Sequence, residues 1–251
     1  RLETDAYGNV WFDADPAGFW LWSLHPYFSV EKGIDTRNRF TKDNGVFFPP
    51  VNPEGAGGYD PVNYPKATIK SSHFSQACGW FHKKFDYFGS GVQDEKMGFL
   101  LYRPDDPHEV NFEMMKACRY TGMPVMHERS VAHVYEDFRD NNMLPFLMKG
   151  EDGFHGITTN QKIIRDGVAM LQARYQPPKA EGQKDQIANY PFEDGLRSLD
   201  NFDPSNTTQF DPTMGEIMLE FGLKQITFTN QTDKSHSTMM QIMREINPPR
   251  K

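Results

Sequence analysis

Long apolar runs, cysteines and clusters of basic residues are all scarce in this 251-residue chain. The most apolar segments, 18–24 and 97–102, are far shorter than the about 20 residues that a bilayer-spanning helix needs. We therefore expect no transmembrane segment, and any membrane association would be peripheral and through partners. No signal-peptide core is visible. Because the chain begins at Arg1, we leave open whether a targeting peptide was removed.

Two cysteines, Cys78 and Cys118, are too few for a disulfide framework. Both fall on segments whose apolar residues recur at helical spacing, so we interpret them as small buried apolar side chains. Free cysteines fit a reducing compartment. We predict a mitochondrial location, with another reducing intracellular compartment as the alternative.

Acidic residues outnumber basic residues, and the basic residues are scattered along the sequence. The formal net charge is −7, and no run of Lys or Arg is longer than Lys83-Lys84 or Arg250-Lys251. Nucleic-acid binding draws on clustered Lys and Arg that displace condensed counterions. The composition therefore predicts other protein subunits as partners, and no nucleic acid.

Familiar catalytic and cofactor motifs are missing as well. The glycines of Gly55-Ala56-Gly57-Gly58 are followed by Tyr59-Asp60-Pro61, and not by the helix N-terminus that a phosphate-binding loop requires. The aspartates sit beside turn residues or prolines, where turn and cap chemistry explains them. We therefore predict no cofactor and no resident metal.

Aromatic residues and prolines dominate the N-terminal part. All four tryptophans fall in the first 80 residues, whereas twelve of the thirteen methionines follow residue 105. Residues 1–70 show no sustained period, and pairs such as Asn44-Gly45 and Pro49-Pro50 mark turns and extended backbone. We expect 1–70 to be an extended aromatic and proline-rich arm, lying on the rest of the chain or on another chain.

After residue 70, apolar side chains recur at helical spacing. The expected helices cover residues 72–88, 107–121, 128–141, 158–176, a segment opened by Asp211-Pro212, and 235–246. The 226–229 segment alternates like a short strand, and 179–211 is a polar linker or surface arm. The sequence thus predicts a mainly α fold, with an irregular body of about six helices over 71–251.

One group of residues suggests acid/base or metal chemistry. His127 and Glu128 are followed six residues later by His133, a spacing that on one helix sends the two rings to opposite sides. His133 and Glu136 form a His-x-x-Glu pair, the reverse of the order in carboxylate-bridged metal bundles, and no second copy occurs. A small metal- or acid/base-dependent enzyme using His127, Glu128, His133 and Glu136 is therefore the alternative function.

The leading hypothesis is a non-catalytic accessory subunit of a large multiprotein assembly, such as a mitochondrial energy-transducing complex. Weak catalytic signals, many prolines and aromatic-rich extended segments motivate it. A third hypothesis is a ligand-binding module that stacks ligands on Trp20, Trp22 and Tyr27. Large aromatics in extended segments are typical anchors of protein contacts. The predicted partner-binding residues are Trp11, Trp20, Trp22, Tyr27 and Phe28.

Overall fold

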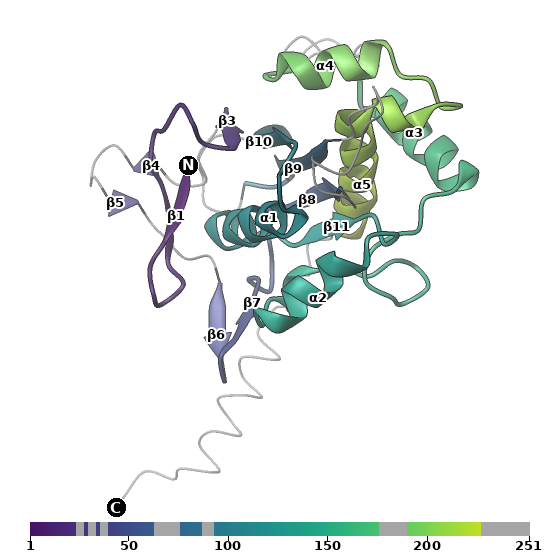
Figure 1. Cartoon of the computed structure of the whole chain (residues 1–251). Helices are drawn as coiled ribbons and strands as arrows, with labels where there is room; N and C mark the ends of the chain where they lie inside the picture. The colour runs from purple at the N-terminus through teal and green to yellow at the C-terminus, as the bar shows by residue number, and fades with distance from the viewer. Residues whose placement is uncertain are drawn as a thin grey trace, which may run out of the picture.

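A five-stranded mixed sheet forms the centre of the protein. The computed structural model describes residues 1–23, 28–29, 34–35, 40–62, 76–86, 93–175 and 190–226. The strand order is β11-β8-β9-β10-β3, with β11 parallel to β8 and every other neighbour antiparallel (Figure 1). The strands are β3 (Trp20–Trp22), β8 (Gly55–Asp60), β9 (Ala77–Lys83), β10 (Glu95–Tyr102) and β11 (Val125–His127).

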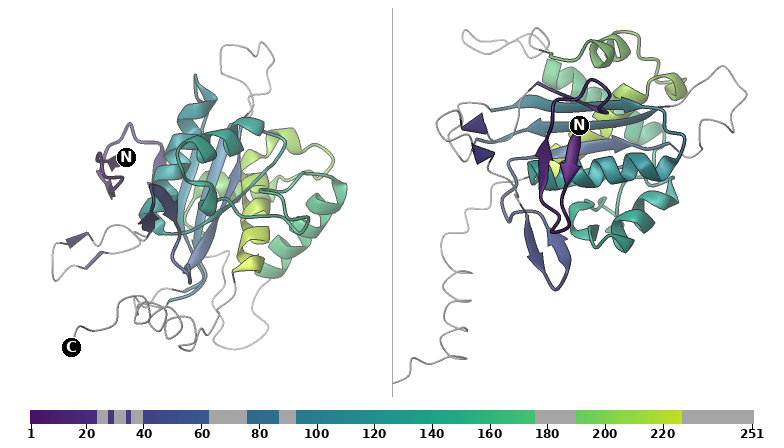
Figure 2. Two further views of the ribbon diagram at one scale, coloured as in Figure 1. Left: turned by 90° about the horizontal axis from the view of Figure 1, so that it is seen from below. Right: turned by 60° about the vertical axis from the view of Figure 1, so that its left-hand side comes forward.

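Helices cover both faces of this sheet, so the core is built from three layers (Figure 2). One face carries α1 (Pro107–Thr121) and α2 (Ala132–Asp140). The opposite face carries α5 (Asp211–Gln225), which lies along β8 and β9, and α3 (Gln161–Tyr175) and α4 (Glu193–Asp200) pack against α5.

Side chains of the two central strands alternate between the two helical layers, as the pleat requires. In β9, Trp80 faces α5, whereas Phe81 faces α1. In β8, Gly58 faces α5 so closely that an added Cβ would lie 2.3 Å from the Gly215 carbonyl oxygen. Gly58 therefore lets the α5 backbone rest directly on the strand.

The N-terminal segment folds back on this body. The hairpin of β1 (Leu2–Thr4) and β2 (Val10–Phe12) lies against α1, where the Lys116 ammonium donates to the Leu2 carbonyl oxygen at 2.7 Å. The other described elements are β4 (Phe28–Ser29), β5 (Ile34–Asp35), β6 (Thr41–Asp43), β7 (Val46–Phe48) and the short 3₁₀ turns Leu144–Phe146 and Thr207–Gln209.

The expected mainly α fold was wrong: the protein is mixed α/β. Two strands of the central sheet, β3 and β8, belong to the expected extended arm. The expected 72–88 helix contains β9, all of whose residues are buried. A strand covered on both faces is apolar throughout, so periodicity alone does not separate it from a buried helix.

Other expected helices agree with the structure wholly or in part. The 107–121 prediction is confirmed by α1, which the Asp106 carboxylate caps and which Gly122 ends at φ 70°. The 158–176 prediction matches α3 in all but its ends, and Asp211-Pro212 does open α5. The 128–141 helix is shorter, because α2 begins only at Ala132, after a β-bridge from Glu128 to Ile157 and a turn at 129–130.

The polar 179–211 segment is only partly described, and it contains α4. The expected 235–246 helix lies outside the described residues, as does all but Ile226 of the 226–229 strand. Among the helices that the structure does describe, none combines the length and apolarity needed to cross a membrane.

Candidate functional site

Three carboxylates from three separate elements gather at one edge of the sheet. The parallel strands β8 and β11 end side by side, β8 at Asp60 and β11 just before Glu128. The Glu128 backbone N–H donates to the Tyr59 carbonyl oxygen at 3.0 Å, which holds Glu128 next to Asp60. Helix α5 begins at Asp211, whose charge also acts on Asp60. In open α/β sheets this carboxyl edge is where ligands bind.

Burial and mutual repulsion act on these carboxyl groups. Asp60 is 8% exposed and Asp211 is 9% exposed. Burial, followed by the charges of Asp211 and Glu128, raises the pKa of Asp60 well above its usual value. Burial also raises the pKa of Asp211 to about 6, although the Gln76 N–H donates to its Oδ2 at 2.6 Å and Arg103 lies nearby.

The carboxyl groups of Asp60 and Glu128 face each other, and their contact adds to the effect of burial on the pKa of Asp60. Two carboxyl groups at such close range favour the form in which one of them carries a proton. The arrangement is therefore a pair of acids, with Asp60 buried and Glu128 half-buried, and a third acid nearby. A divalent cation held by Asp60 and Glu128 would replace the proton and neutralise the repulsion.

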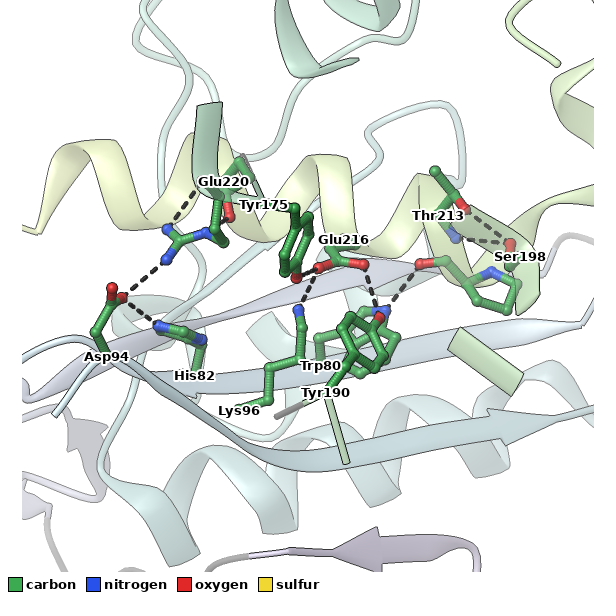
Figure 3. A network of polar contacts seen from close by, with 12 residues as sticks. Trp80, His82, Asp94, Lys96, Tyr175, Tyr190, Ser198, Thr213, Glu216 and Glu220 are labelled. Atoms are coloured by element: carbon green, nitrogen blue, oxygen red, sulfur yellow. Dashed lines mark hydrogen bonds and ion pairs between the residues drawn. The ribbon is translucent and has the colours of Figure 1, made fainter. Parts of the chain in front are cut away.

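The first turn of α5 is fixed in place by contacts with the sheet and with α4. The Trp80 indole Nε1 donates to the Pro212 carbonyl oxygen at 2.8 Å, and the Thr213 and Ser198 hydroxyls are 2.7 Å apart (Figure 3). Asp211 immediately precedes Pro212. These contacts therefore set the position of its carboxylate.

A network of buried charges lies further along the same helix (Figure 3). Lys96 on β10 pairs with Glu216 on α5, and both side chains are almost fully buried. Glu216 also accepts hydrogen bonds from the Tyr175 hydroxyl and, at 2.9 Å, from the Tyr190 hydroxyl. The Lys96 ammonium lies 4.5 Å from the centre of the Trp80 ring. The charged groups are paired with one another, so this network holds layers together and leaves no open ligand position.

A second chain of ion pairs continues this network. Arg174 on α3 pairs with Glu220 on α5 and donates to Asp94 Oδ1 at 2.8 Å. Asp94 in turn contacts the His82 Nε2 at 2.8 Å. Burial lowers the pKa of His82 to about 4, so this histidine is neutral at physiological pH. This series of side-chain contacts links α3 and α5 to the sheet.

Another cluster, on the α1 face, has the residue types of a metal site. The ligand atoms of His108, His133 and Asp137 all lie within 4.8 Å of one another. However, the Asn111 Nδ2 donates to the His133 Nδ1 at 2.8 Å and to the Asp137 Oδ2 at 2.6 Å. The amide of Asn111 therefore occupies the point on which these lone pairs converge, and the cluster is a hydrogen-bond network.

The residues of the alternative enzyme hypothesis are separated by the fold. Glu128 lies in the carboxylate site, whereas Glu136 is exposed on α2. His127 points into the interior and is 1% exposed, and burial lowers its pKa to about 3. His133 lies on α2 and belongs to the Asn111 network. Of these four residues, only Glu128 is brought together with Asp60 and Asp211.

The predicted partner-binding aromatics have varied surroundings. Trp20 is 4% exposed and stacks on Trp22, with ring centres 5.3 Å apart. Trp11 is half-buried in β2. Tyr27 lies outside the described residues, and Phe28 is in β4. Trp20 and Trp22 thus serve the protein's own core, and partner binding by this set stays a prediction.

Sequence reasoning missed Asp60 and Asp211. Each is followed by a proline; Asp211 was expected only to open a helix, and Asp60 was given no role. A usable signal was present: an apolar or glycine-rich strand ends in a carboxylate at Asp60, and another apolar segment ends at Glu128. Comparison with family models, curated proteins and solved structures gave no match. The function must therefore be inferred from the chemistry of the site.

Proposed function

We propose that this protein is a divalent-metal-dependent hydrolase of phosphodiesters, in which Asp60 and Glu128 hold the cation and Asp211 adds negative charge beside them. The observation that carries the proposal is the meeting of the Asp60 and Glu128 carboxyl groups at the ends of adjacent parallel strands, next to Asp211 on α5. The donors are oxygens only. Oxygen-only sites suit Mg²⁺ or Mn²⁺, whereas sites with histidine or cysteine suit zinc.

The preference of such cations for phosphate defines the substrate class. Mg²⁺ is usually held by one or two carboxylates together with substrate phosphate oxygens. Carboxylate sites with two metal ions stabilise both the attacking and the leaving oxygen of an in-line displacement in phosphatases, polymerases and nucleases. A water oxygen would form the new bond to phosphorus, and the bond to the ester oxygen would break, with a proton passing to the leaving alkoxide.

The protein's own residues contribute position and charge. Asp60 and Glu128 are held by paired strands, and Asp211 by the anchored first turn of α5, so these acids are fixed in place before any cation arrives. A proton held by Asp60 would leave when a cation binds. The net charge of −7 argues that a nucleic-acid strand would be held by metal bridging and local contacts, and not by a broad basic surface.

The test uses the full chain with Mg²⁺ or Mn²⁺ and four substrates: single-stranded DNA, double-stranded DNA, RNA and bis(p-nitrophenyl) phosphate. Asp60→Asn and Glu128→Gln should each lower the rate by more than the about 10- to 100-fold that loss of an outer-shell partner costs, and Asp211→Asn should lower it by about that amount. Glu136→Gln, which removes an exposed carboxylate from α2, is the matched control and should leave the rate unchanged. Activity that persists in EDTA, or in Asp60→Asn, would overturn the proposal.

A second candidate is a subunit role within a larger assembly. Large apolar side chains of the N-terminal part are exposed, with Tyr7 at 78%, Leu21 at 57% and Val51 at 73%. Isolated exposed apolar residues are ordinary, but several in one region favour contact with another protein. Native mass determination of material from the source organism tests this role: a free monomer would count against it.

A further inference from the structure

The backbone on both sides of Asp60 is held from the α1 face of the sheet. Tyr59 precedes Asp60 in β8, and its side chain points to the opposite face, where it is fully buried. Val62 follows two residues later, and its carbonyl oxygen accepts a hydrogen bond from His133 Nε2 at 3.1 Å. The Asp60 carboxylate thus projects toward α5 from a stretch of chain that is fixed before and after it.

One buried amide, that of Asn111 on α1, connects the two attachment points. The Tyr59 hydroxyl donates to the Asn111 Oδ1 at 2.6 Å, and the Asn111 Nδ2 donates to the His133 Nδ1 at 2.8 Å. The same Nδ2 donates to the Asp137 Oδ2 at 2.6 Å. Asn111 is 0% exposed, and its oxygen and both its N–H groups have partners.

This pattern fixes the protonation state of His133. Its Nε2 faces a carbonyl oxygen and must donate, whereas its Nδ1 faces an N–H donor and must accept. The ring is therefore neutral, with its proton on Nε2. Partial burial lowers the pKa of His133 below its usual value, in agreement with a neutral ring.

We propose that Asn111 is a positioning residue for the metal site, acting on Asp60 through Tyr59 on one side and through His133 and Val62 on the other. This inference rests on the proposed function. Catalytic constellations must be held to within about 0.5 Å of their productive geometry, and residues behind the ligands supply that precision. Fixing the chain at residues 59 and 62 leaves Asp60 little freedom except rotation of its own side chain.

The polar character of the network supports a positioning role. Tyr59 belongs to a hydrophobic cluster that includes Val134 and Phe138, and Asn111, to which it donates, is fully buried. Burying an amide and a hydroxyl there is costly, and apolar residues of similar volume often give equal or greater stability. A network that served stability alone would have no need of these polar groups.

The experiment compares variants of the network with a variant that only weakens the core. Tyr59→Phe removes one hydroxyl, and Asn111→Leu replaces the amide by an apolar group of similar size. Met115→Ala empties space in the same cluster on α1 and is the control for lost stability. For each protein the Mn²⁺ concentration for half-maximal activation, kcat, and the melting temperature in EDTA are measured. We expect Tyr59→Phe and Asn111→Leu to weaken Mn²⁺ activation about 10- to 100-fold, and Met115→Ala to lower only the melting temperature.

A pair of substitutions at His133 separates positioning from packing. His133→Gln retains a side-chain N–H that can reach the Val62 carbonyl oxygen, whereas His133→Leu does not. The Gln variant should therefore recover Mn²⁺ activation relative to the Leu variant. Equal activation constants in wild type, Tyr59→Phe and both His133 variants would overturn the inference. Failure of wild type to respond to Mn²⁺ at all would instead overturn the proposed function.

Discussion

The carboxyl groups of Asp60 and Glu128 lie next to each other at the ends of two parallel strands, and Asp211 adds a third negative charge. Without a cation, this arrangement is unfavourable, because the ionised form of Asp60 is both buried and repelled. Cores rarely place acids in this way unless a ligand compensates for the cost. The acids that would bind a cation here should therefore lower the stability of the metal-free protein.

The first prediction concerns Asp60→Asn in the absence of metal. The Asn amide N–H can donate to Glu128 as the protonated acid does, and it carries no charge. We expect the variant to have a higher melting temperature than wild type at pH 7.5 in EDTA, while its hydrolytic activity is lost. Differential scanning calorimetry measures the first effect. A lower melting temperature would show that Asp60 stabilises the metal-free protein and is not strained within it.

The second prediction is stabilisation by the cation itself. A ligand that binds only the folded state at 100 times its Kd adds about 2.7 kcal/mol of stability. For a chain of this size that corresponds to a rise in melting temperature of about 5–10 °C. Mn²⁺ should produce this shift in wild type and not in Asp60→Asn or Glu128→Gln. The Glu136→Gln protein should shift as wild type does, and an equal shift in all four proteins would exclude these ligands.

The third prediction is a pH dependence carried by Asp211. The pKa of its carboxyl is about 6 in the folded protein, above the unfolded value near 3.8. The folded state therefore binds more protons at Asp211 between these two values, and the contribution of this carboxyl to stability falls as the pH rises from about 4 to 6. His82 and His127, with pKa values of about 4 and about 3, act in the opposite direction over the same range, because the unfolded state binds their protons. The stability of Asp211→Asn, from urea titrations in EDTA, should therefore rise relative to that of wild type as the pH increases from about 4 to 6.

The sequence predicted helices well where capping residues mark their ends. Asp106, Pro107 and Gly122 delimit α1 at the expected positions, and Asp211-Pro212 opens α5. The central strands were not predicted, because their residue types suggest other kinds of structure. In β8, Gly58 belongs to a glycine run that suggests a turn but instead lets α5 approach the backbone, and residues 77–81 of β9 are apolar on both faces.

The site was harder to predict than the helices, because it depends on how the elements are arranged. Glu128 was among the candidate catalytic residues, but its expected partners were its neighbours in sequence. Its actual partners, Asp60 and Asp211, are 68 and 83 residues away in the chain. They meet only because β8 and β11 pair in parallel and α5 lies along β8. No local spacing encodes such a meeting.

The last prediction concerns the buried pair of Lys96 and Glu216. Removing one partner leaves the other charge buried and unpaired, which typically costs about 3–5 kcal/mol. Glu216→Gln and Lys96→Met should each lower the free energy of unfolding by this amount in urea titrations. The double variant buries no charge at this position, so it should lose clearly less than the two single losses added together.

An exposed ion pair supplies the control for this double-mutant cycle. Lys224 and Glu151 are 3.7 Å apart, with side chains 63% and 86% exposed. Because solvent screens such pairs, Lys224→Met should change the free energy of unfolding by less than about 0.5 kcal/mol. If the losses at Lys96 and Glu216 were strictly additive, the two charges would not be coupled. Helix α5 would then be held by the other contacts drawn in Figure 3, among them the Arg174–Glu220 ion pair and the hydrogen bond from Trp80 to Pro212.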